Sequence, residues 1–341
     1  MAASNLTLVL PPLSFSAPEN DQFISLLEQN AKSLASLQCI LSRGERQSFD
    51  AQEIILTELF GLPYINLDEL PLAAIMAMGS GFDAATGYWL HAEPVHLLPD
   101  LDHVLLFDRS AFELAKNELG QLIEELQELF EESGLSIYFG KKNNLFIRVD
   151  DKPDVSFTAL QDVSGNNILQ HLPEGKDSAR WRLLQNEIQM QMTQSTVNQR
   201  REKSGAMTVN GLWFWGEGYL ARSKFQRCYE HVVAKPLFIA GLARMTDAVI
   251  ERQSGGFNNI NKSRKTLVAI EAPEKTPEAS LTALLDLEQK WLSPALTALN
   301  KGEIESLTLV LGKTKTVITR KLKRRFWKRN IRAAVLASLL S

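Results

Sequence analysis

Residues 180–218 read RWRLLQNEIQMQMTQSTVNQRREKSGAMTVNGLWFWGEG, and this stretch organises the interpretation of the chain. Its first half has apolar residues at helical spacing, which predicts a helix through Leu183, Leu184, Ile188 and Met192. Basic residues and Gly205 follow, and the apolar run Val209–Trp215 then predicts a buried strand. Gly216 and Gly218 close that strand.

Trp213 and Trp215 lie two residues apart, so a strand places them on one face, just before the Gly-x-Gly turn. In an open α/β sheet, ligands usually bind beside the turn that follows a strand's carboxyl end. The alternative is that both indoles are core residues and that Gly216 and Gly218 are plain turn residues. The residues alone leave both interpretations open.

Polar residues around this strand are the candidates for ligand binding. An arginine suits a phosphate because its guanidinium donates two parallel hydrogen bonds, and asparagines add further bonds. Glu217 could act as an acid–base group. The alternative for Arg201 is a structural ion pair with Glu187 or Glu217. The predicted ligand-binding set is Asn198, Arg200, Arg201, Asn210, Trp213, Trp215 and Glu217.

Composition excludes several classes of protein. The 341 residues are 45% hydrophobic and 23% charged, as in ordinary globular proteins. No apolar run reaches the roughly eighteen residues of a membrane span. The first residues lack the basic region of a signal peptide. Cys39 and Cys228 form neither a disulfide framework nor a metal-ligand spacing, so we expect a cytoplasmic protein.

Charge is distributed unevenly. Residues Lys313–Arg332 contain ten Lys and Arg and no acid; subtracting ten from the net charge of −3 leaves −13 on the rest. Such a segment could engage nucleic acid or an anionic membrane surface. Alternatively it docks through Phe326 and Trp327, with its cations against acidic helices such as 113–132. We expect the docked form, with polyanion binding secondary.

The order of predicted elements indicates an α/β fold. Strands are predicted at 5–10, 266–271 and 306–311 with a hairpin partner at 315–319, and helices at 21–41, 51–60, 236–250 and 277–299. Between them, strands 88–97, 104–107, 135–139 and 145–149 surround a helix at 109–132. We therefore expect a mostly parallel sheet covered by helices, formed by 1–83 and 182–341, with an inserted α+β lobe at 84–181.

The stretch from Val197 to Gly218 resembles a block of a bacterial family described as regulatory proteins of the RpfE type. The matching positions are Val197, Asn198, Arg201, Gly205, Asn210, Trp213, Trp215, Gly216 and Gly218. That family is similar in turn to the archaeal-type cofactor-independent phosphoglycerate mutases, and segments 92–149 and 266–299 resemble those mutases in order and spacing. The resemblance implies an alkaline-phosphatase-like fold.

The catalytic residues implied by that resemblance do not carry over. These mutases use two metal ions and a serine or threonine nucleophile. Where the first strand should end in Asp-Gly, this chain has Leu10-Pro11-Pro12, and where the nucleophile should follow Asp50 stands Ala51. No His follows Glu271, where the mutases have a metal-binding one. Lys313 stands where the mutases have an Asp-His pair.

Histidines do not supply a metal site either. Strand alternation places His91 and Glu93 on one face and His96 on the other, so the two histidines should not converge. We therefore expect no catalytic residue, no metal and no cofactor, and a degenerate mutase-like protein that binds a small anionic ligand or a protein partner. The alternatives are a phosphomonoester mutase or hydrolase with a rearranged site, and a nucleic-acid- or membrane-associated factor.

Overall fold

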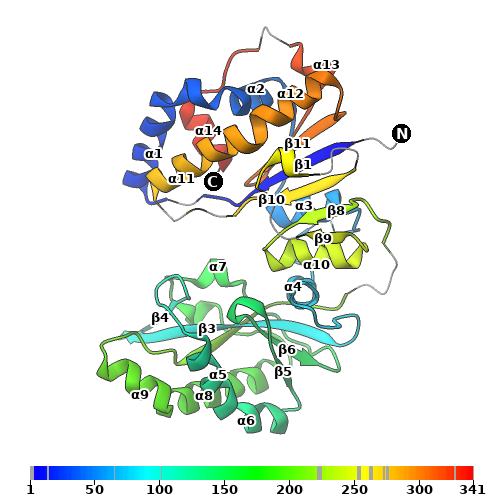
Figure 1. Cartoon of the computed structure of the whole chain (residues 1–341). Coiled ribbons are helices and arrows are strands. Elements are labelled where there is room, and N and C mark those ends of the chain that lie inside the picture. The colour runs from blue at the N-terminus through cyan, green and yellow to red at the C-terminus, as the bar shows by residue number, and fades with distance from the viewer. Residues whose placement is uncertain are drawn as a thin grey trace. The chain divides into compact units, whose positions relative to one another are not determined.

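The computed structural model describes residues 4–13, 15–64, 66–100, 102–220, 225–251, 255–260, 264–271, 273, 276–325 and 328–340. The chain divides into two compact units, Met1–Glu69 with Lys224–Ser341, and Leu70–Ser223 (Figure 1). Each unit has its own sheet. None of the described helices is long and apolar enough to cross a membrane.

The first unit contains a seven-stranded, mostly parallel sheet, which confirms the expected fold class. Strands β11, β1, β10, β8 and β9 run parallel, whereas β12 pairs antiparallel with β11 and β2. In spatial order the strands are β2 (Glu45–Ser48), β12 (Thr314–Thr319), β11 (Ser306–Leu311), β1 (Asn5–Leu10), β10 (Thr266–Ala269), β8 (His231–Val233) and β9 (Val249–Glu251).

Helices cover this sheet because the strand side chains alternate. Leu6 and Leu8 enter a large apolar core with one group of helices. Thr7 points to the other face and its hydroxyl lies 3.0 Å from that of Tyr229, whose ring contacts Phe60 at the end of α3 (Gln52–Leu59). The helices of the first face are α1 (Ala17–Gln29), α2 (Ala35–Arg43), α11 (Pro277–Leu287), α12 (Ser293–Lys301) and α14 (Ala333–Leu340).

The C-terminal segment is docked on this unit. Leu336, Ala337 and Leu340 of α14 are buried in the same core, and α14 packs on α1. The Leu13 amide donates to the Leu340 carbonyl over 2.7 Å. Residues 113–132 belong to the second unit, so the expected contact between them and the basic segment stays a prediction. Phe326 and Trp327, to which docking was attributed, lie outside the described residues.

The second unit contains a five-stranded antiparallel sheet built on β3 (Tyr88–Asp100). The start of β3 pairs with β6 and its end with β4, and β7 runs along residues 89–95. The other strands are β4 (His103–Phe107), β5 (Ser136–Phe139), β6 (Leu145–Val149) and β7 (Gly211–Gly218).

Alternation along β7 separates two cores in this unit. Leu212 and Phe214 pack with Trp181 of α8, whereas Trp213 joins Val95 and Ile168 in a smaller cluster on the opposite face. Around the sheet lie α4 (Leu72–Ser80), α5 (Lys116–Glu125), α6 (Gln127–Glu132), α7 (Leu160–Val163), α8 (Ser178–Gln194) and α9 (Thr196–Lys203).

The prediction that the tryptophan strand belongs to the parallel sheet is wrong. The strand exists as predicted, but β7 pairs antiparallel with β3 and does not belong to the parallel sheet. Contacts likewise assign 70–83 and 182–223 to the second unit, whereas the predicted boundaries placed them in the first. The cause is the length of β3, whose 13 residues give β7 an antiparallel partner.

Three predicted helices are shorter or divided. The predicted helix 21–41 breaks at Asn30, whose side-chain amide donates to the Leu26 carbonyl and ends α1. The predicted helix 109–132 begins only at Lys116 and is divided at Leu126. The helix α10 (Leu237–Met245) stops before 250 because Asp247 adopts a left-handed conformation (φ 54°), and the chain continues as β9.

Candidate functional site

The carboxyl ends of β1, β10 and β11 meet at one edge of the first unit's sheet, since these strands are parallel. Leu10, Ala269 and Leu311 are their last residues. Open α/β sheets place ligands outside this edge. The residues that follow these strands are therefore the first candidates for a functional site.

The start of α3 lies at this edge. Gln52 bridges two strands there, since its side-chain nitrogen donates to the Leu10 carbonyl (2.8 Å) and the Gly312 carbonyl (3.3 Å). Ala51 is the N-cap residue of α3 and is buried, whereas Asp50 is exposed. The predicted helix 51–60 therefore begins one residue later, at Gln52. The side chain at the helix start is a methyl group, which cannot attack a phosphoryl group.

The single described acid at the end of β10 is already paired. The Glu271 carboxylate contacts the Lys235 ammonium, which follows β8. Both side chains are about half exposed, at 42% and 48%. The residue that follows β1 is Pro11, which has no donor atom in its side chain. The Glu271 carboxylate of this edge is thus neutralised by Lys235.

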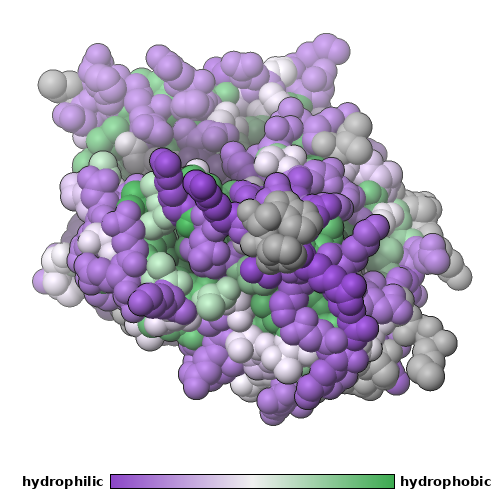
Figure 2. All heavy atoms as spheres, turned by 90° about the horizontal axis from the view of Figure 1, so that it is seen from above, coloured by the Kyte–Doolittle hydropathy of each residue, from purple (hydrophilic) through white to green (hydrophobic). Residues whose placement is uncertain are grey.

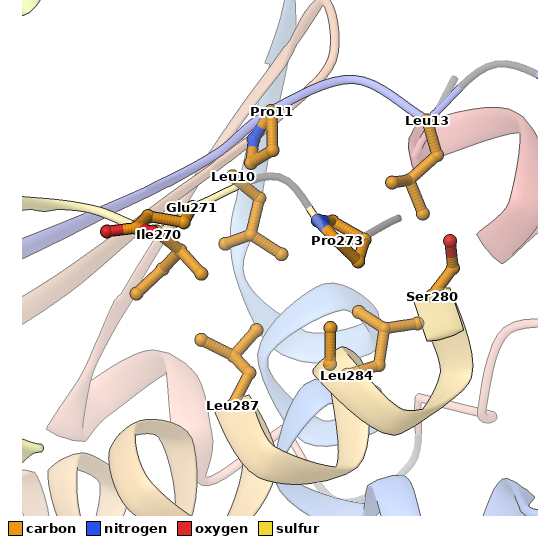
Figure 3. Close-up of a pocket in the computed structure, with 10 residues that line it drawn as sticks. Leu10, Pro11, Leu13, Ile270, Glu271, Pro273, Ser280, Leu284 and Leu287 are labelled. Atoms are coloured by element: carbon orange, nitrogen blue, oxygen red, sulfur yellow. The ribbon is translucent and has the colours of Figure 1, made fainter. Parts of the chain in front are cut away.

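A small apolar pocket of about 20 Å³ opens beside these strand ends. Figure 3 shows Leu10, Ile270, Leu284 and Leu287 converging on it, while the Glu271 carboxylate points away. Ser280 supplies a polar group in the lining, and its hydroxyl is buried without a hydrogen-bond partner among the described residues. The further lining residues are Pro11, Leu13, Pro273 and Ala283.

These residues do not fit a pair of divalent ions. Carboxylate and imidazole are the donors that such ions require. Within the described part of the chain, no three His, Cys, Asp or Glu side chains lie close enough together to hold a metal ion. Pro11, Ala51 and the paired Glu271 occupy the edge instead.

In the second unit, Asn198 has a structural role that its sequence position did not reveal. Its amide nitrogen donates to the carbonyls of Met192 (2.7 Å) and Val209 (2.8 Å), and its oxygen accepts from the Val209 amide (2.8 Å). The side chain therefore ties the end of α8 to the start of the tryptophan strand. All of its hydrogen-bonding groups are engaged within the chain.

Arg201 is held in a buried ion pair with Glu118, not with Glu187 or Glu217 as the alternative proposed. One terminal nitrogen lies 3.0 and 2.9 Å from the two carboxylate oxygens. Its other nitrogens donate to the carbonyls of Met207 and Glu113. Arg200, the next residue on α9, is exposed and donates to Gln121.

Asn210 and the tryptophans extend the contact between β7 and its neighbours. Asn210 exchanges two hydrogen bonds with the backbone of Leu97, at 2.7 and 2.9 Å. The Trp213 indole donates to the Thr158 carbonyl over 2.9 Å. The Trp215 indole nitrogen is buried and has no partner among the described residues.

Glu217 and its two glycines lie where β7 bends. Glu217 accepts from the Phe157 amide (3.1 Å), and burial raises the pKa of its carboxyl. Gly216 has a φ of 68°, and a Cβ there would come 3.1 Å from the Leu72 Cβ. The turn thus requires glycine at this position both for its φ and for close packing on α4.

A buried polar network on β3 was missed by the sequence interpretation. His91 is 1% exposed, and its Nε2 lies 2.9 Å from Asn144 Oδ1. Its Nδ1 lies 3.5 Å from Glu93 Oε2, and Glu93 Oε1 lies 3.6 Å from Arg109 Nε. Arg109 also donates to the carbonyls of Lys142 and Asn143. No sequence signal connects Arg109 or Asn144 with this strand, because only folding brings them there.

The network fixes the proton positions. Asn144 uses its amide nitrogen on the Lys141 carbonyl (2.8 Å), so its oxygen accepts from His91 Nε2. His91 Nδ1 then carries a lone pair that faces Glu93 Oε2, and this arrangement favours a protonated Glu93. Burial raises the pKa of Glu93 to about 7 and lowers that of His91 to about 4. His91 and His96 point apart as predicted, since His96 bonds to Thr208.

Known proteins with similar sequences are phosphoglycerate mutases. A probable 2,3-bisphosphoglycerate-independent phosphoglycerate mutase of Geobacter sulfurreducens is 27% identical over 187 residues, which are 53% of this chain and 47% of that protein. The enzyme of Methanosarcina mazei is 23% identical over 265 residues, covering 69% and 67%. The matched stretch thus spans about half of the first relative's length. No family model matches the chain.

Solved structures with a similar fold cover nearly the whole chain. The cofactor-independent phosphoglycerate mutase of Thermoplasma acidophilum matches with a TM-score of 0.51 at 14% identity, over 99% of this chain and 95% of that one. A protein of Pyrococcus horikoshii matches with a TM-score of 0.57 at 13% identity, over 98% and 92%. The chain is therefore distantly similar in sequence to 2,3-bisphosphoglycerate-independent phosphoglycerate mutases, and it shares the alkaline-phosphatase-like fold of the solved mutase structure.

Proposed function

We propose that this chain is a catalytically degenerate phosphoglycerate mutase-like protein that acts in the cytoplasm by binding, as a regulatory protein of the RpfE type. The observation that carries the proposal is the chemistry of the sheet edge. Pro11 and Ala51 stand where metal ligation and nucleophilic attack would need oxygen atoms, and Glu271 is paired with Lys235.

The pocket beside that edge supports a binding role. It is lined mainly by Leu, Ile and Pro side chains, with the Ser280 hydroxyl as a single buried donor or acceptor inside it. Binding pockets typically combine an apolar lining with a few polar groups that fix orientation. This arrangement favours a small, mostly apolar group with one hydrogen-bonding atom. A ligand-binding role for the seven residues between Asn198 and Glu217 stays a prediction.

The second candidate function is a phosphoglycerate mutase or a related phosphomonoesterase. It is favoured by one observation, the sequence similarity to 2,3-bisphosphoglycerate-independent phosphoglycerate mutases. Such an enzyme would need a rearranged site, because the sheet edge lacks the expected donor side chains.

One pair of measurements separates the two candidates. The full chain, purified without chelators, is analysed for bound metal and assayed for conversion of 3-phosphoglycerate with added Mn²⁺, beside an active mutase as positive control. We expect substoichiometric metal and no conversion above the protein-free rate. Stoichiometric metal, together with turnover that a chelator abolishes, would establish the enzyme and sink the binding proposal.

A second experiment tests the pocket itself. We expect a small apolar probe, 2-propanol, to bind the native chain weakly as followed by NMR chemical shifts, and Ala283→Leu to weaken that binding because the added side chain fills the pocket opening. Thr282→Leu is the matched control, since Thr282 lies on the exposed side of α11. Equal probe binding by both variants would show that this pocket is not the binding site.

A further inference from the structure

The structure shows how few cations of the segment Lys313–Arg332 are neutralised. Lys315 contacts Glu58, and Arg325 lies 3.5 Å from Glu45. Arg320 donates to two carbonyls at the end of α12. These three engaged cations lie on β12 and on or just after α13 (Arg320–Lys323).

The other seven cations have no acidic partner in the described part of the chain. Six of them are exposed, and Lys323 is half-buried. Lysine and arginine side chains without a partner keep their full charge for an external anion. The seven are Lys313, Lys321, Lys323, Arg324, Lys328, Arg329 and Arg332.

The basic segment is anchored on the first unit at two backbone positions, Lys323 and Ile331. The Arg43 guanidinium donates to the Lys323 carbonyl over 2.9 Å, and the Ile331 amide donates to the Gln38 side chain over 3.0 Å. The helix α14 then enters the core. The cations on either side of the two undescribed residues are therefore held in place before any ligand arrives, which lowers the entropic cost of binding.

The fold also adds cations that the sequence run does not contain. Because Arg325 lies beside Glu45 of β2, the exposed Arg46 of the same strand lies near the segment. Arg43 at the end of α2 contributes a further guanidinium. Viewed from above, the molecule presents many strongly hydrophilic side chains, as Figure 2 shows.

The apolar side chains of the segment face inward. Ile318 and Leu322 are buried, and Ile331 packs against the core. A peripheral membrane surface normally places apolar side chains beside its cations so that they enter the lipid. Ile318, Leu322 and Ile331 are thus turned into the unit, and the vesicle measurement below tests an anionic bilayer as the alternative.

We propose that the basic surface formed by Lys321, Arg324, Lys328, Arg329 and Arg332 binds the phosphate backbone of nucleic acid without reading its sequence. Three of the five are arginines, whose planar guanidinium pairs with phosphate oxygens through two parallel bonds. Binding of this kind weakens steeply with salt, because each neutralised phosphate releases counterions. It adds an interaction to the proposed function and does not depend on it.

The test uses fluorescence anisotropy with a labelled 20-base-pair duplex of mixed sequence and a labelled single strand. The test variant is Arg324→Gln/Lys328→Gln/Arg329→Gln in the full chain. The matched control is Lys32→Gln/Lys152→Gln/Lys203→Gln, which removes the same charge from exposed positions elsewhere. At about 50 mM salt we expect the test variant to bind the duplex at least about tenfold more weakly, with a salt slope smaller by about 3.

The control should bind like the native chain, and both variants should melt like it because the changed side chains are exposed. Binding to phosphatidylserine vesicles is measured in parallel. Absence of native binding at low salt, or equal loss in both variants, would overturn the proposal. Vesicle affinity equal to or above the nucleic-acid affinity would also overturn it and would assign the surface to an anionic membrane.

Discussion

At the carboxyl edge of the first unit's sheet, Glu271 is paired with Lys235 in a half-exposed ion pair, and the pocket beside them is apolar. On β3 of the second unit, His91, Glu93 and Arg109 form a network that is largely buried. The edge expected to be functional thus holds few charged side chains, whereas the shifted pKa values of His91 and Glu93 belong to the second unit. Buried polar groups are costly unless they are bonded, so such networks sustain either structure or function.

The largest expected effect comes from the buried pair in the second unit. Arg201→Met leaves Glu118 without its partner and two backbone carbonyls without a donor, and breaking such a pair costs about 3–5 kcal/mol of unfolding free energy. Urea denaturation measures this loss. Arg200→Met, one residue earlier and exposed, is the matched control and should change stability by less than about 0.5 kcal/mol. Equal effects would mean that Arg201 is not structural and would revive its predicted ligand role.

A smaller effect depends on pH. The pKa of Glu93 rises from 4.5 to about 7 on folding, so its contribution to stability is fully present below pH 4.5 and is lost as the pH rises through 7. Glu93→Gln imitates the protonated acid and removes this loss. Relative to the native chain, the unfolding free energy of the variant should rise by on the order of 3 kcal/mol between pH 4.5 and pH 8.

His91 must be considered in the same experiment. Its pKa falls from 6.5 to about 4, so its contribution is present above pH 6.5 and is lost as the pH falls through 4. The two slopes oppose each other in the native chain, and only the difference between variants isolates Glu93. Glu128→Gln, at an exposed position, is the control and should show no such trend. A flat difference for Glu93→Gln would show that Glu93 is ionised throughout.

The smallest expected change in stability comes from a substitution at Ala51, at the carboxyl edge of the first unit's sheet. Ala51→Ser supplies the missing N-cap oxygen of α3 and should raise stability by about 0.5–1 kcal/mol. Ala51→Cys, of similar size but with a weak acceptor, should not. Thermal denaturation measures both. If Ala51→Ser produced mutase turnover, the proposed degeneracy would rest on a single hydroxyl, and the comparison between the two units would need revision.

The sequence by itself determined the local elements and the fold class. Short stretches rich in apolar residues predicted β1, β3, β7 and β11, and a hairpin partner of β11 was predicted at 315–319, where β12 lies. Two of the failed helix ends arise at single residues that periodicity does not detect, the side-chain hydrogen bond of Asn30 and the left-handed backbone of Asp247. Motif spacing also predicted that Ala51 lies at the start of a helix.

Only the tertiary structure decided which sheet each strand joins and which polar groups meet. An alternating pattern specifies that a strand has a buried face, but not which strand becomes its neighbour, so β7 was placed in the wrong sheet. The same limit hid the partner of Arg201 and the link between Arg109 and Glu93, because these groups are far apart in the chain. Pairing over such separations depends on the packed fold, which brings each charge to the carboxylate or carbonyl that compensates its burial.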